Sequence, residues 1–175
     1  DGGFVWECDP TGAQPARRHS AMGAFAHEAA AIAADGRCYL TEDRPDGGFY
    51  RFTPNAAGDL SSGVLEVATG SAPGAITWVP VPNPRPALLE PACRRQVPGS
   101  IEFDGGEGVA TDGALVWFTT KGDDRVWEYD SATSQLSLRY QGGAASELSG
   151  VDNLWLDHSS GGLLVAEDGG DMQVV

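Results

Sequence analysis

The sequence predicts an all-β fold, namely a β-propeller of four-stranded antiparallel blades with about three blades present and the ring incomplete in this chain. Two observations lead to this prediction. The 175 residues include 24 Gly and 11 Pro, a composition that favours many short strands joined by turns. Three segments also share one layout, and an antiparallel meander repeated along a chain is typical of propeller blades. The three segments are residues 27–54, 107–130 and 152–175.

Each segment has an acidic residue at or next to its start (Glu28, Glu107 and Asp152) and then a short apolar run, followed by a glycine turn and two further strand-like runs. Gly tolerates the positive φ that tight hairpins need, so these turns predict antiparallel pairing. The turns are Asp35-Gly36, Asp112-Gly113 and Gly161-Gly162. A fourth run follows at 63–69 and at 135–141. The step from Glu107 to Asp152, 152 − 107 = 45 residues, matches the ~40–50 residues of a typical blade.

We expect residues 1–175 to be part of one propeller domain, with blades near 27–80, 107–141 and 152–175. Residues 2–10 are predicted to form an outer strand with no blade before it. Residues 81–100 are rich in proline, which predicts an extended excursion or lid rather than a helix. Three blades cannot close a ring that usually needs roughly four to eight. We therefore expect the rest of a longer chain, or an assembly partner, to complete the ring.

Residues 24–36 present a conflict between two signals. The segment is rich in alanine, and on propensity alone it would be helical. The repeat places it in the same position as the openings of the other two segments, where an innermost strand is expected. Small side chains suit such a strand because it is crowded near the axis. We favour the strand, with a helix as the alternative.

Charge and cysteine content exclude some classes of protein and leave others open. The formal charge of −14 and the absence of a basic stripe argue against nucleic acid as a partner. No apolar run approaches the ~20 residues of a membrane span. Three cysteines are too few for a disulfide framework, and either a Cys8–Cys38 or a Cys38–Cys93 bridge is compatible with the sequence.

The acidic residues that open the repeats are the candidate metal ligands. In a propeller the innermost strands line the channel, so the starts of these strands converge on one face. Glu28, Glu107, Asp152 and Asn153 should therefore approach one another despite their separation in sequence. Their oxygen atoms suit Ca²⁺ or Mg²⁺, and Fe³⁺ with a soft or bridging partner. The alternative for each residue is a role in capping a strand or turn.

A second acidic set ends the second strand of two repeats. The set consists of Thr41-Glu42-Asp43 and Glu167-Asp168, with a constant offset of 125 residues between the acidic pairs (167 − 42 and 168 − 43), and the middle repeat has Thr119-Thr120 there. Asp168 is a further candidate metal ligand, whereas Asp43 is equally suited to bracing the following turn. His27 precedes Glu28 on the strand, so its side chain points to the other face and is predicted to be structural.

Two basic pairs could reach an anionic substrate, although a solvated surface position is the favoured interpretation for both. These pairs are Arg17-Arg18 and Arg94-Arg95. The sequence has no GxSxG elbow, HExxH motif, CxxC pair or P-loop, so nothing in it supports serine-hydrolase or zincin chemistry.

The sequence resembles the PhoX family of alkaline phosphatases. The run GGFVWECDP, the HE that opens the first repeat, and TED followed by YRF occur in the family's order, as do the later FDGGEG, GVDNL and LVAEDGG. This resemblance implies a propeller with more blades than are present here, and hydrolysis of small phosphomonoesters at a cluster of Ca²⁺ and Fe³⁺. It also implies export through a twin-arginine leader, and hence a secreted or periplasmic protein.

The resemblance implies that Glu28, Glu107, Asp152 and Asn153 occupy ligand positions. Two departures stand out. The family has an arginine that contacts phosphate two residues before its second Glu, where this chain has Gly105. The iron-bound cysteine of the family cannot be equated with Cys8.

Three functions follow from these features. The preferred one is a PhoX-like metal-dependent phosphatase for which no general acid can be named. The second is a non-catalytic propeller, stabilised by calcium, that serves in binding or assembly. The third is a lactonase-like hydrolase, because such propellers also hold one central Ca²⁺ with Glu, Asn and Asp. Glu28, Glu107, Asn153 and Asp168 would suit that site.

Overall fold

The computed structural model describes residues 2–143, 146–169 and 172–175, and in this part of the chain all regular structure is β except for two short 3-10 helices. The predicted all-β class is confirmed. The first strands are β1 (Val5–Glu7), β2 (Arg17–His19), β3 (His27–Ile32), β4 (Cys38–Glu42), β5 (Phe49–Ala56), β6 (Asp59–Gly70) and β7 (Gly74–Pro80). The others are β8 (Gly106–Asp112), β9 (Leu115–Thr120), β10 (Arg125–Asp130), β11 (Gln135–Gln141), β12 (Val151–Asp157) and β13 (Gly162–Glu167). The 3-10 helices are η1 (Ser20–Met22) and η2 (Cys93–Arg95).

Two blades are joined into one nine-stranded antiparallel sheet. Its order is β3-β4-β5-β6-β7-β11-β10-β9-β8, so β3 to β6 form one meander and β8 to β11 form the next. Strand β7, which the repeat pattern does not predict, pairs with β6 along its length and with β11 at two positions. It therefore links the outer strands of the two blades. The third blade begins with the two-stranded sheet of β12 and β13, next to which Ala166 forms an isolated bridge to Val174.

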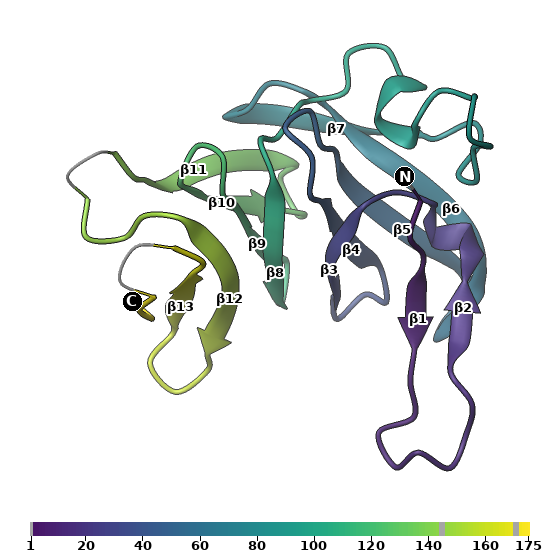
Figure 1. Ribbon diagram of the computed structural model, residues 1–175, viewed down its shortest axis with the longest axis horizontal. Helices are drawn as coiled ribbons and strands as arrows, with labels where there is room; N and C mark the ends of the chain where they lie inside the picture. The colour runs from purple at the N-terminus through teal and green to yellow at the C-terminus, as the bar shows by residue number, and fades with distance from the viewer. Residues whose placement is uncertain (1, 144–145, 170–171) are drawn as a thin grey trace.

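The innermost strands of the three blades lie side by side. Strand β8 contacts β3 on one side and β12 on the other, although neither pair is joined by a β-ladder. In Figure 1, β8 and β12 run in the same direction, with their arrowheads at the lower end. Because β3 and β8 are the two ends of the nine-stranded sheet and yet touch, that sheet nearly closes on itself. The starts of successive inner strands are thus brought to one face.

The alanine-rich segment is a strand and not a helix. Residues 27–32 alternate between half-buried and exposed positions, and Ile32 pairs with Cys38 across the turn at Asp35-Gly36. The ladder with β4 and the packing against β8 outweigh a helix preference of a few tenths of a kcal/mol per residue. The tertiary context therefore decides this element, as the repeat predicts.

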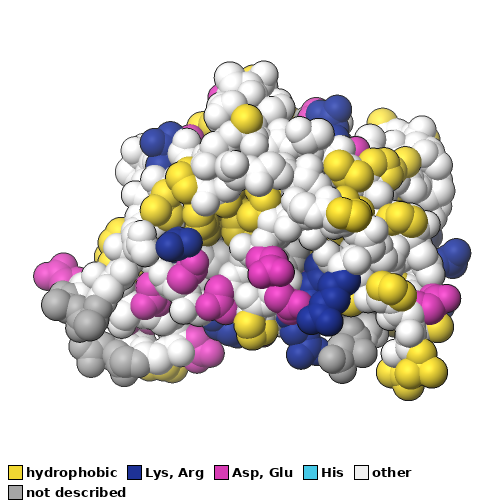
Figure 2. Space-filling view, turned by 90° about the horizontal axis from the view of Figure 1, so that it is seen from above, with side chains coloured by type: hydrophobic (Ala, Val, Ile, Leu, Met, Phe, Trp, Pro, Cys, Tyr) yellow, Lys and Arg dark blue, Asp and Glu magenta, His cyan; other side chains and the backbone are white. Residues whose placement is uncertain are grey.

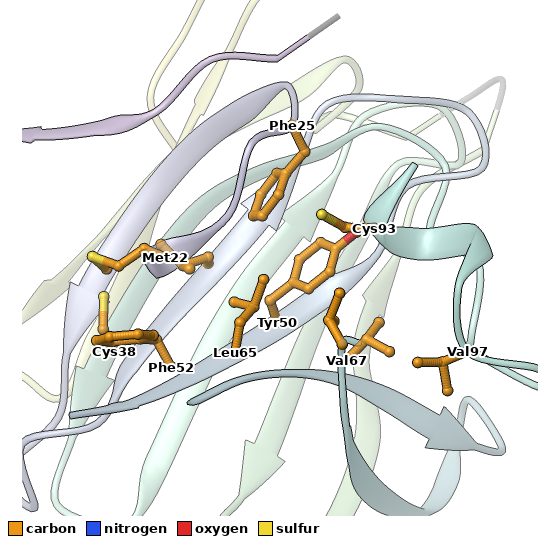
Figure 3. Packing of buried hydrophobic residues seen from close by; sticks show 11 residues of the cluster. Met22, Phe25, Cys38, Tyr50, Phe52, Leu65, Val67, Cys93 and Val97 are labelled. Atoms are coloured by element: carbon orange, nitrogen blue, oxygen red, sulfur yellow. The ribbon is translucent and has the colours of Figure 1, made fainter. Parts of the chain in front are cut away.

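Residues of the proline-rich segment 81–100 pack into the core of the first blade. This core contains Phe25, Tyr50, Phe52 and the two buried thiols Cys38 and Cys93. Figure 3 shows the thiols apart from each other, Cys38 beside Phe52 and Cys93 beside Tyr50. All three cysteines are free, so neither of the bridges that the sequence left open is formed.

The proline-rich segment, residues 81–100, has no α-helix, and its one helical element is η2. Its closing residues add Val97 to the first core. A second core between the first two blades is rich in aromatic rings, and the rings of Phe49 and Phe118 stack with centroids 4.2 Å apart. A smaller core under the third blade contains Val126, Val151 and Val165. Within the described residues, no helix is long and apolar enough to cross a membrane.

Candidate metal centre

Each inner strand carries an irregularity at the same place, immediately after its first residue. The pairing register shifts between His27 and Ala30 in β3, between Gly106 and Val109 in β8, and between Val151 and Leu154 in β12. A β-bulge of this kind takes the extra residues out of the ladder and re-aims their side chains. The residues it displaces are Glu28-Ala29, Glu107-Gly108 and Asp152-Asn153. The same distortion therefore presents an acidic side chain in three successive blades.

Three of the acidic residues meet. Carboxylate oxygens of Glu28, Glu107 and Asp152 all lie within 4.8 Å of one another. Glu107 is 2% exposed, whereas Asp152 is half-buried and Glu28 is exposed, so the group runs from a buried base out to solvent. Figure 2 shows Asp and Glu side chains gathered near the middle of the upper face, next to Lys and Arg side chains.

A lysine enters the cluster from the end of β9. The ammonium of Lys121 lies 2.5 Å from Glu107 Oε1 and 2.9 Å from Asp43 Oδ2, and its side chain is 43% exposed. The aliphatic part of Lys121 lies against Gly105, where an added Cβ would come within 2.9 Å of it. Gly105 has φ +70°, which also favours glycine. The position at which the resemblance led us to expect arginine is thus filled by a lysine side chain from a neighbouring strand.

The cluster is short of positive charge. The carboxylates of Glu28, Asp43, Glu107 and Asp152 surround the ammonium of Lys121. Burial, opposed by Lys121 and assisted by the nearby carboxylates of Asp152 and Glu28, raises the pKa of Glu107 to about 7. Burial and the charges of Asp152 and Asp43 also raise the pKa of Glu28. The ion pair with Glu107 raises the pKa of Lys121, so this lysine stays charged.

Carboxylates this close together repel one another, and a cation among them would relieve that repulsion. The donor set is all oxygen, which suits a hard cation such as Ca²⁺. A buried carboxylate at the base, with two more at its rim, therefore fits a metal ion.

The other two candidate ligands lie differently. Asn153 uses its side-chain oxygen to accept a hydrogen bond from the Leu154 N–H at 2.9 Å, and it packs against Gly108. A Cβ on Gly108 would lie 2.7 Å from that oxygen, so glycine is required where the two bulges touch. Asp168 is exposed, and its N–H donates to the carbonyl of Gly150. Within the described residues, Asp168 does not belong to the group of three carboxylates.

The acidic residues next to these positions brace turns. Glu42 is fully buried and accepts hydrogen bonds from Gly48 N–H at 3.0 Å and from Tyr50 Oη at 2.7 Å. Its other oxygen bonds Arg94 at 2.7 Å. Glu167 accepts a 2.7 Å hydrogen bond from Ser149 N–H. The Glu of each acidic pair therefore has a structural role. The prediction of a solvated surface position is wrong for Arg94, whose side chain is largely buried against Glu42.

His27 also has structural surroundings. Its ring stacks on Phe25 at 3.6 Å, and Nε2 lies 3.1 Å from the carbonyl oxygen of Gly23. Burial lowers the pKa of His27 to about 4, so the ring is neutral near pH 7.

Sequence reasoning missed Lys121 and the partner role of Asp43. Aligning the second strands would have found them, because Lys121 and Asp43 differ by 121 − 43 = 78 residues, the same offset as Thr119 and Thr41. Equivalent positions in neighbouring blades therefore carry opposite charges. Comparing blades position by position, rather than searching for acids alone, exposes this pair.

The known proteins that this chain resembles point to one family. A family model described as alkaline phosphatase PhoX matches residues 1–175. The chain belongs to the PhoX family. A solved structure, "Pseudomonas fluorescens PhoX in complex with vanadate, a transition state analogue", is similar with a TM-score of 0.72 and 19% sequence identity.

That likeness covers 96% of this chain but 43% of the solved one, so the chain spans less than half of its PhoX neighbour. At this identity the likeness shows the fold, and it confirms the predicted propeller. No curated protein matches the chain.

Proposed function

We propose that the protein is a metal-dependent phosphatase of the PhoX type that hydrolyses small phosphomonoesters. The observation that carries the proposal is the convergence of Glu28, Glu107 and Asp152, from three blades, within 4.8 Å in a chain of this family. The PhoX neighbour is in complex with vanadate, a transition state analogue, which supports phosphoryl chemistry in the family. Export to a secreted or periplasmic location is part of the same proposal.

In this proposal Glu28, Glu107 and Asp152 hold calcium, with iron as a second candidate metal, and Asn153 and Asp168 are the further candidate ligands. A bound cation supplies charge stabilisation for phosphoryl oxygens and an activated oxygen nucleophile. The three carboxylates come from different blades, so the fold fixes their spacing before any ion arrives. Burial of Glu107 keeps water from competing for the base of the site.

Lys121 is the proposed substrate contact. Its ammonium shares Glu107 with the proposed cation, is 43% exposed and is held beside the cluster by Asp43 at 2.9 Å. An ammonium is a compact point charge that binds phosphate oxygens well. When a cation neutralises Glu107, the lysine can turn from that carboxylate towards an anionic substrate.

The test is an assay of a chromogenic phosphate monoester with Ca²⁺, with and without iron. We expect phosphate release that Glu107→Gln reduces by at least about a hundredfold, because the base of the site is lost. The matched control is Asp59→Asn, because the exposed Asp59 carboxylate at the start of β6 accepts a hydrogen bond from Ser61 N–H, and its loss should leave the rate unchanged. Lys121→Met should raise KM more than it lowers kcat.

Two outcomes would contradict the proposal. Turnover of a lactone without release of phosphate would favour a lactonase-like hydrolase. No turnover of either substrate, together with binding of calcium, would leave a propeller that calcium stabilises and that serves in binding or assembly. That alternative has support in the structure, since the carboxylates join three blades whose inner strands share no ladder.

A further inference from the structure

A threonine hydroxyl crosses each of the two junctions between blades, just below the carboxylates. Thr41, at the end of β4, donates a 2.5 Å hydrogen bond to the backbone carbonyl of Glu107 in the next blade. Thr119, at the end of β9, donates in the same way to the backbone carbonyl of Asp152. The two threonines occupy equivalent positions in successive blades, with 119 − 41 = 78 residues between them.

The bulges explain why these carbonyls need a partner. A bulge removes its extra residues from the ladder, so their backbone groups lose the usual pairing. Glu107 is 2% exposed, and a buried carbonyl without a hydrogen bond is costly. Thr41 and Thr119 are themselves 1% and 0% exposed, so water does not compete with their hydroxyls. Thr41 Oγ1 also accepts from Ala29 N–H at 3.1 Å, which ties it to the bulge of its own blade.

We propose that Thr41 and Thr119 are positioning residues, each fixing the bulge of the following blade and so the direction of the acidic side chain on it. The hydroxyl acts through the backbone and touches neither ion nor substrate. The β-branched side chain has few χ1 rotamers, which keeps the donor in place at little entropic cost. The inference rests on the proposed function only where it concerns metal affinity.

The bonds of these two threonines differ from a third hydroxyl bond between blades. Thr111, near the other end of β8, bonds the carbonyl of Ile32 at 3.2 Å and lies away from the bulges. It joins the same two blades as Thr41 does. Thr111→Val is therefore a matched control, because it deletes a hydroxyl bond between blades without affecting a residue that carries a carboxylate.

The test measures amide hydrogen exchange in metal-free protein, and then Ca²⁺ affinity by calorimetry. Thr41→Val should speed exchange in residues 106–110 about five- to tenfold and leave 151–155 unchanged, and Thr119→Val should do the reverse. Both variants should bind Ca²⁺ about 10- to 100-fold more weakly, the range typical of losing a group that orients a ligand. Thr41→Ser and Thr119→Ser should restore both readouts, whereas Thr111→Val should change neither.

The proposal is overturned if the valine variants leave exchange unchanged, if serine fails to restore it, or if Thr111→Val has the same effects. It is also overturned if exchange responds but Ca²⁺ affinity does not. If the parent protein binds no Ca²⁺, the proposed metal site fails. The segment-specific exchange pattern still decides whether the hydroxyls hold the bulges.

Discussion

Glu107 is the buried carboxylate of the site, and its raised pKa links the stability of the fold to pH. Its carboxylate is buried beneath two others, and its pKa of about 7 means that the folded state holds a proton more tightly than the unfolded chain does. From the sequence, Glu107 could be predicted to lie at the start of an inner strand, because it is the first residue of a repeat. Sequence alone could not predict its burial or its contact with Lys121, since both depend on how neighbouring blades pack.

The raised pKa of Glu107 gives the metal-free protein a defined pH dependence. Below about pH 4.5 both states are protonated there, and the stabilisation is complete; it is lost as pH rises through about 7. From about pH 5 to about pH 8, this residue should lower the free energy of unfolding by about 2–3 kcal/mol. Urea unfolding in a chelator measures it. Glu107→Gln should remove that decline, and an equal decline in the variant would assign it to other groups.

At the scale of elements, one ion pair docks residues 81–100 on the first blade. Arg94 bonds the fully buried Glu42 at 2.7 Å and lies 2.9 Å from Asp46, whereas Arg95 reaches Asp46 from a side chain that is 68% exposed. The proline content predicted an excursion, but no local pattern could show which arginine turns inward. Strand β3, in contrast, could be predicted from the sequence, because its position in the repeat indicates a strand although its alanine content favours a helix.

The two neighbouring arginines make a matched pair of variants. Arg94→Met leaves the Glu42 charge buried without its cation, and it should lower the free energy of unfolding by about 3 kcal/mol or more. Arg95→Met removes an exposed ion pair and should cost about 1 kcal/mol or less. Denaturant unfolding measures both, and limited proteolysis near the exposed Leu88-Leu89 should be faster for the Arg94 variant. Equal effects would show that Arg94 does not anchor the segment.

At the scale of the molecule, the propeller fold brings residues that are far apart in sequence together at one site. The repeat period and the glycine turns were enough to predict blades, inner strands and the meeting of Glu28, Glu107 and Asp152. The bulges, the link through β7 and the threonines across the junctions were not predictable, because each depends on contacts between blades. Asp168 had the same repeat signal as the other acids, yet the structure leaves it exposed outside the group.

The central claim is that acidic residues from three blades hold a cation together, and the metal content of purified protein tests it most directly. After gel filtration, elemental analysis should find calcium, with or without iron, in stoichiometric amounts in the parent protein and in Asp59→Asn. Glu107→Gln should have lost it. A parent protein without bound metal, or a Glu107→Gln variant that keeps the full amount, would contradict the account.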